Sequence, residues 1–165
     1  MKNFVFITLI VIIVIGGCCN QSNKKSDKDL MTSEFLIADT ITYPIRIKNL
    51  NPEDSWATER LKDLNCTKMV DDIFNSVLSG KTIAYHYLTH KPFTVSDIQE
   101  LESNDKFSRD KVVELEFKEQ WWMDANRSLF KKEIISILVA YELTDEENQF
   151  MGLKAAFYIK TKPIK

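Results

Sequence analysis

The strongest alternation of apolar and polar residues predicts a long antiparallel β-hairpin, around which the rest of the chain is organised. In residues 112–126 the apolar side chains occupy every second position, as a strand with one buried face requires; they are Val113, Leu115, Phe117, Trp121 and Met123. Glu119 interrupts this face once. A turn is predicted at residues 124–127, because Asp and Asn side chains hydrogen-bond their own backbone. The second strand, residues 127–141, has apolar residues at both odd and even positions in its second half, which is typical of a strand that is covered on both faces or lies in the middle of a sheet.

Helices are predicted in the segment between the first strand and this hairpin. The first, residues 51–64, begins with Asn as the N-cap and Pro at the first helical position. The second is expected to start at Thr67, to carry apolar residues at helical spacing and to end at Gly80. The third is capped by Thr94, with Asp97 three residues later in a variant of the capping box.

Further strands are predicted from the same alternation at residues 35–50, 82–88 and 150–160. Pro44 lacks a backbone donor, so the first of these strands is expected at a sheet edge or at a bulge. The element order is therefore β-α-α-β-α-β-β-β. It predicts an α+β domain over residues 35–165: an antiparallel sheet with a C-terminal three-stranded meander and two to three helices packed on one face.

The N-terminus carries the pattern of a bacterial lipoprotein signal. Lys2 precedes an apolar run, residues 4–15, that is too short for a membrane span of ~20 residues. The run ends in Ile-Gly-Gly-Cys, so cleavage is predicted after residue 17 and lipid attachment at Cys18. A plain N-terminal anchor helix is the alternative. Residues 18–34 are polar and predict a flexible tether between the membrane and the domain.

Charge and cysteine content exclude several classes of protein. The 22 Lys and Arg residues nearly balance the 24 Asp and Glu residues, and no basic block exists, so a nucleic-acid partner is not expected. Of the 3 cysteines, Cys19 is the poorer lipid acceptor, because Gly16 stands three positions before it. Cys66 is most simply a small buried apolar residue, and no disulfide framework is implied.

No residue pattern predicts catalysis, a metal or a cofactor. His86 and His90 are the 2 histidines of the chain. On the predicted strand and turn they lie roughly 13 Å apart, too far to share a zinc ion with ligand distances near ~2 Å. The chain lacks the G-x-S-x-G elbow and a glycine-rich phosphate loop, and its paired carboxylates lie on faces expected to be solvated.

The adjacent Trp121 and Trp122 point to opposite faces of the predicted hairpin. Parity places Trp121 inward and leaves Trp122 outward, where an exposed indole is typical of a protein interface. A sheet covered on both faces, with both indoles internal, is equally compatible. Trp122, Asp124 and Arg127 are the predicted partner-binding residues.

Residues 112–137 resemble the gliding-motility protein N family (GldN, also called PorN), a periplasmic component of the type IX secretion machinery. The resemblance rests on an aromatic pair followed by Asp, a basic turn and an apolar strand, here Trp121, Trp122, Asp124, Arg127 and Lys132-Glu133-Ile134-Ile135-Ser136-Ile137. The resemblance covers roughly residues 67–160, most of the domain. Ser136 stands where the family has glycine, and most of the family's long N-terminal half is absent, so the chain resembles a shortened, lipidated relative.

Two functions follow as hypotheses. The first is a non-enzymatic lipoprotein at the periplasmic face of the outer membrane. The resemblance implies that it binds envelope proteins, among them a component of the secretion ring. The alternative is a ligand-binding or enzymatic outer-membrane lipoprotein. A deep pocket on which His86, Asp124 or Arg127 converge would favour it.

Overall fold

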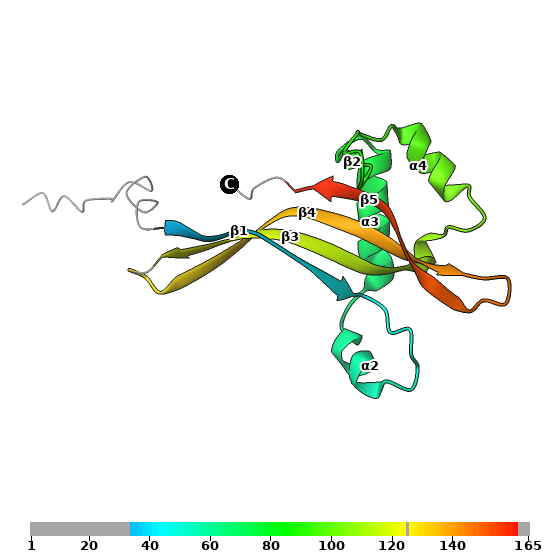
Figure 1. The fold of residues 1–165 in the computed structure, drawn as a ribbon, viewed down its shortest axis with the longest axis horizontal. Coiled ribbons are helices and arrows are strands. Elements are labelled where there is room, and N and C mark those ends of the chain that lie inside the picture. The colour runs from blue at the N-terminus through cyan, green and yellow to red at the C-terminus, as the bar shows by residue number, and fades with distance from the viewer. Residues whose placement is uncertain (1–33, 125, 162–165) are drawn as a thin grey trace, which may run out of the picture. The chain divides into compact units, whose positions relative to one another are not determined.

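The computed structural model describes residues 34–124 and 126–161. The predicted signal peptide and Cys18 lie outside the described residues. The described strands form one antiparallel sheet in the order β1-β3-β4-β5-β2 (Figure 1). They are β1 (Glu34–Arg46), β2 (Ala84–Tyr85), β3 (Val112–Asp124), β4 (Leu129–Thr144) and β5 (Phe150–Lys160). The predicted α+β class and the C-terminal meander β3-β4-β5 are confirmed.

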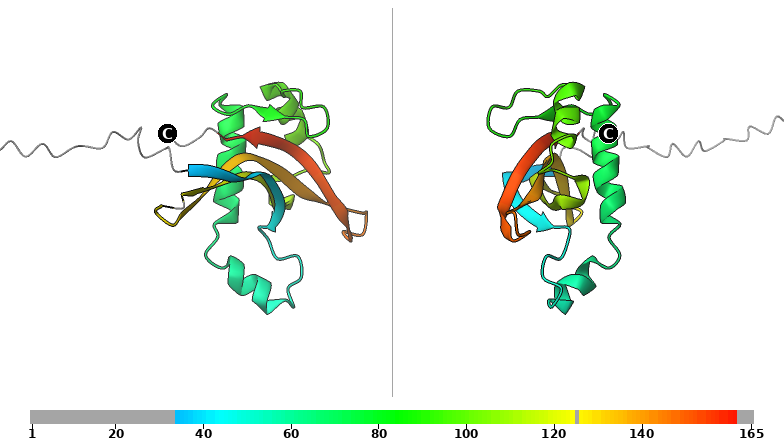
Figure 2. Two further views of the ribbon diagram at one scale, coloured as in Figure 1. Left: turned by 60° about the vertical axis from the view of Figure 1, so that its left-hand side comes forward. Right: turned by 90° about the vertical axis from the view of Figure 1, so that its right-hand side faces the viewer.

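The helices are α2 (Ser55–Leu61), α3 (Cys66–Leu78) and α4 (Val95–Glu102), with a short 3-10 turn at Arg109–Lys111. Figure 2 shows α3 and α4 on the same face of the sheet, called here the helix face. Phe74 of α3 is fully buried, and its ring lies 5.0 Å from that of Phe157 of β5. Burying such a side chain contributes about 1.5–3 kcal/mol. Helix α2 contributes no buried residue and extends from the core.

Two helix starts differ from the prediction. Helix α2 begins at Ser55 with Asp54 as its N-cap, whereas Asn51 forms a turn by accepting a hydrogen bond from the Glu53 amide. Helix α3 begins at Cys66, because the Asn65 side chain accepts from the Lys68 amide and caps the helix before Thr67. The capping box of Thr94 and Asp97 is confirmed.

The length predicted for the strand at residues 82–88 is wrong, because the strand in the structure has only two residues. Only Ala84–Tyr85 pairs with β5, and the chain then turns back. The ring Nδ1 of His86 accepts from the amides of Leu88 and Thr89, and His90 closes the turn with a left-handed φ of 56°. Strand β1 is an edge strand, as Pro44 predicted. In the part of the chain that the structure describes, no helix is long and apolar enough to cross a membrane.

Candidate functional site

The distal end of the β3-β4 hairpin, with the start of β1, forms a part of the sheet that extends past α3 (Figure 1). We call this part the hairpin end and define it as residues 34–38, 121–124 and 126–134. Large apolar side chains are exposed here on all three strands; they are Phe35, Leu36, Ile37, Met123, Leu129, Phe130 and Ile134. Clustered exposure of this kind marks an interaction site rather than ordinary surface.

Cross-strand register arranges the hairpin end in rows. The outermost row pairs Glu34 with Asp124 and Asp124 with Leu129. The next row is entirely apolar and joins Phe35, Met123 and Phe130. The third row joins Leu36, Trp122 and Lys131. Since successive residues of a strand point to opposite faces, both faces of the hairpin end expose apolar side chains.

Trp121 and Trp122 separate onto the two faces, as the alternation predicts. The Trp121 indole N–H donates to Glu119 at 2.9 Å and its ring packs edge-on against Phe130, both on the helix face. Trp122 is half-buried on the opposite face. Its indole nitrogen is buried and has no hydrogen-bond acceptor among the described residues.

The structure brings Asp124 and Arg127 together in the hairpin turn. Asp124 is only 2% exposed. Its Oδ1 accepts from the amides of Asn126 at 3.0 Å and Arg127 at 3.3 Å, and its Oδ2 lies 3.5 Å from Arg127 Nε. Asp124 therefore holds the turn that presents Trp122 and Arg127, and the predicted contact with a partner stays a prediction.

Glu119 forms a buried polar cluster that the sequence did not predict. It is 4% exposed, and its carboxylate accepts from the Tyr43 hydroxyl at 2.6 Å and from the Trp121 indole. Lys132 Nζ lies 3.8 Å from the same carboxylate and 4.5 Å from the Trp121 ring. The cluster ties together β1, β3 and β4 where α3 no longer covers the sheet. Its only signal in the sequence is the single acidic residue on an apolar strand face.

The cluster changes the acidity of its members. Burial alone raises the pKa of Glu119, but the hydrogen bonds from Tyr43 and Trp121 and the charge of Lys132 outweigh it and hold that pKa below its ordinary value. The hydrogen bond that the Tyr43 hydroxyl donates to Glu119 raises the pKa of Tyr43, because ionisation of the hydroxyl would break it. Glu119 therefore stays ionised at neutral pH, with its oxygens occupied by protein donors. This is the state of a structural carboxylate rather than of a general acid.

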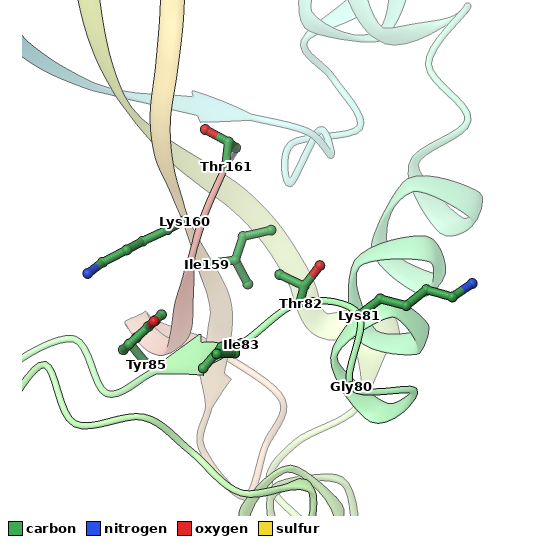
Figure 3. Close-up of a pocket in the computed structure, with 8 residues that line it drawn as sticks. All are labelled: Gly80, Lys81, Thr82, Ile83, Tyr85, Ile159, Lys160 and Thr161. Carbon is green, nitrogen blue, oxygen red and sulfur yellow. The ribbon is translucent and has the colours of Figure 1, made fainter. Parts of the chain in front are cut away.

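The most voluminous of the described hollows lies elsewhere, between the end of α3 and the end of β5 (Figure 3). It measures about 660 Å³ and is lined by Gly80, Lys81, Thr82, Ile83, Tyr85, Ile159, Lys160 and Thr161. Figure 3 shows the ammonium groups of Lys81 and Lys160 pointing in opposite directions. The hollow therefore lacks the converging polar groups of a catalytic site.

A smaller hollow of about 240 Å³ opens on the face of the sheet opposite α3. His90 and Tyr158 lie on its wall, with the Tyr158 hydroxyl 3.3 Å from His90 Nδ1. Neither hollow is lined by His86, Asp124 or Arg127. Cys66 is no activated nucleophile, because burial raises the pKa of its thiol. The convergence that would have favoured an enzyme is thus not observed at these hollows.

The family model described as "Gliding motility associated protein GldN" matches residues 21–164, which include all the described elements. No curated protein matches the chain significantly. The chain belongs to the GldN family. Membership associates it with gliding motility and type IX secretion in the cell envelope.

Proposed function

We propose that this member of the GldN family is a non-enzymatic lipoprotein, anchored through Cys18 at the periplasmic face of the outer membrane, whose domain binds protein components of the gliding and type IX secretion machinery. The family match supports the role in the machinery. The Ile-Gly-Gly-Cys sequence supports the anchor. No cofactor enters this proposal.

The binding surface is the face of the sheet opposite α3, beginning at Trp122. The observation that carries it is a half-buried indole on a sheet face from which α3 and α4 are absent (Figure 2). Arg127 lies at the same end, with its side chain 39% exposed, and Asp124 fixes the turn that positions it. An indole and a guanidinium on one rigid hairpin are the residue types that most often dominate protein interfaces.

Affinity capture from detergent-solubilised envelope tests the binding role. Trp122→Ala should reduce recovery of secretion-machinery proteins at least tenfold relative to the wild-type chain. Trp56→Ala is the matched control, because Trp56 on α2 is 67% exposed and lies outside this face. If both variants recover the same proteins as the wild-type chain, the Trp122 surface is not the interface. If the wild-type chain itself recovers no secretion-machinery protein, the proposed role fails.

Metabolic labelling with palmitate tests the anchor separately. Cys18→Ala should abolish labelling and leave the signal peptide uncleaved, whereas Cys19→Ala should change neither. Labelling that persists in Cys18→Ala would place the lipid on another residue.

A further inference from the structure

We infer that the tip of the hairpin end inserts into the membrane that carries the lipid anchor, with Phe35, Leu129 and Phe130 entering the boundary between headgroups and acyl chains. This inference rests on the proposed lipidation of Cys18. It assigns a second membrane contact to the chain, made by the folded domain itself.

The first argument is that large apolar side chains are exposed on both faces of the hairpin end, next to its polar turn. Phe35, Met123 and Phe130 form one row, and Leu129 in the preceding row points to the opposite face. Phe35, Leu129 and Phe130 are 49%, 54% and 51% exposed. A protein partner covers one face of a sheet, whereas a bilayer surrounds whatever enters it. Exposure on both faces therefore favours lipid at the tip itself, whereas the protein-binding surface proposed above begins one row further from the turn, at Trp122.

The second argument is the position of the tip along the chain. Glu34 pairs with Asp124, so β1 enters the sheet beside the hairpin turn. Residues 18–33 span at most roughly 55 Å when fully extended. A lipid on Cys18 therefore keeps the tip within this distance of the bilayer surface. The turn between β4 and β5 lies at the other end of β4, roughly 50 Å further along the strand.

The third argument comes from the residues behind the tip. Trp121 follows the apolar row on β3 and its ring packs against Phe130, and indole rings are enriched at membrane–water interfaces. The hairpin end carries Arg127, Lys131 and Lys132 against Glu34, Asp124 and Glu133. These charges balance, so no net attraction to anionic lipid is expected, and the contact with zwitterionic lipid rests on the apolar side chains.

Fluorescence quenching by brominated lipid tests the inference on the lipidated chain. The mature protein carrying Trp56→Phe is reconstituted in phosphatidylcholine vesicles with or without bromine on the acyl chains, so that only Trp121 and Trp122 report. Brominated vesicles should lower the emission at least twofold. Leu129→Ser with Phe130→Ser should remove most of this quenching. Phe150→Ser with Met151→Ser should retain it, since these equally apolar residues, 53% and 71% exposed, lie at the opposite hairpin.

The outcomes separate this inference from the anchor on which it rests. Absence of palmitate on Cys18 would refute the anchor. Palmitate on Cys18 without quenching, or equal quenching in the two double variants, would refute insertion of the tip alone. Concentration-dependent self-association that requires Leu129 and Phe130, in protein that shows no quenching, would also refute it and assign the tip to a contact between copies of the chain.

Discussion

Glu119→Gln is the most informative single change, because it removes one negative charge from a carboxylate that holds three strands together. The Gln amide offers one acceptor oxygen in place of two, so either the Tyr43 hydroxyl or the Trp121 indole loses its partner. A hydrogen bond to a charged group contributes roughly 1.5–3 kcal/mol, and a buried donor without an acceptor costs a similar amount. We therefore expect Glu119→Gln to lower the free energy of unfolding by about 2–3 kcal/mol at pH 7.

The pH dependence of the unfolding free energy shows whether Glu119 stabilises the fold through its charge or through the shape of its side chain. The folded-state pKa of Glu119 lies below its ordinary value of about 4.3, because hydrogen bonds and Lys132 outweigh the effect of burial. The stabilisation is therefore complete above the ordinary pKa and is lost as the pH falls through the folded-state pKa. The difference in unfolding free energy between the wild-type chain and Glu119→Gln should shrink as the pH is lowered below about 4.

Guanidinium denaturation of the mature chain in mild detergent, followed by tryptophan fluorescence, measures both effects. Tyr43→Phe should cost about 1–2 kcal/mol, and the double variant should cost less than the sum, with a coupling of about 1 kcal/mol. Glu146→Gln, in the exposed turn between β4 and β5, is the matched control and should lie within about 0.5 kcal/mol of the wild-type chain. A Glu119→Gln variant as stable as this control, or a difference that does not change with pH, would refute the reasoning.

Two further changes probe the covered half of the domain by the same denaturation assay. Arg109 donates to Glu102 at 2.6 Å and to Asp71 at 2.9 Å, so Arg109→Met should lower the free energy of unfolding by about 1–2 kcal/mol. Lys62→Met, at an exposed ion pair, is the control and should lower it by less than about 0.5 kcal/mol. Equal losses of stability in the two variants would contradict the structural role of Arg109. Gly80 has a left-handed φ of 72°, and a Cβ atom placed on it would meet no atom within 4 Å. Gly80→Ala should therefore lower the free energy of unfolding by about 1 kcal/mol, through backbone strain and not through a steric clash. An unchanged stability would show that the left-handed turn is not maintained.

The sequence predicted those parts of the fold that depend on short-range patterns. The hairpin, its turn at Asp124 and the capping box at Thr94 each arise within a few residues, and each is confirmed. The start of α3 was misplaced because Asn65 and Thr67 are both good capping residues and only the built helix shows which side chain reaches the amide of Lys68. The length of β2 was overestimated because β-branched and aromatic residues favour a strand, whereas its extent is set by pairing with β5.

The same distinction holds for the candidate surface. Period-two alternation places Trp121 and Trp122 on opposite faces without any knowledge of the rest of the chain. The Glu119 cluster could not be predicted from the sequence, because Tyr43 lies 76 residues from Glu119 along the chain. Only the register between β1 and β3 brings the two side chains together. A lone carboxylate on an apolar strand face indicates that a partner must exist, but its position in the chain does not identify that partner.

The Glu119 cluster also explains how the hairpin end stays ordered without a helix above it. Under α3 the strands are held by the buried core around Phe74 and Phe157. Beyond α3 that core ends, and Glu119 bonds to side chains of β1, β3 and β4 where no described helix covers either face of the tip. Glu119→Gln should therefore increase amide hydrogen exchange in residues 121–124 and 129–134 before it affects α3. Equal increases in both regions would mean that the cluster supports the whole domain rather than the hairpin end.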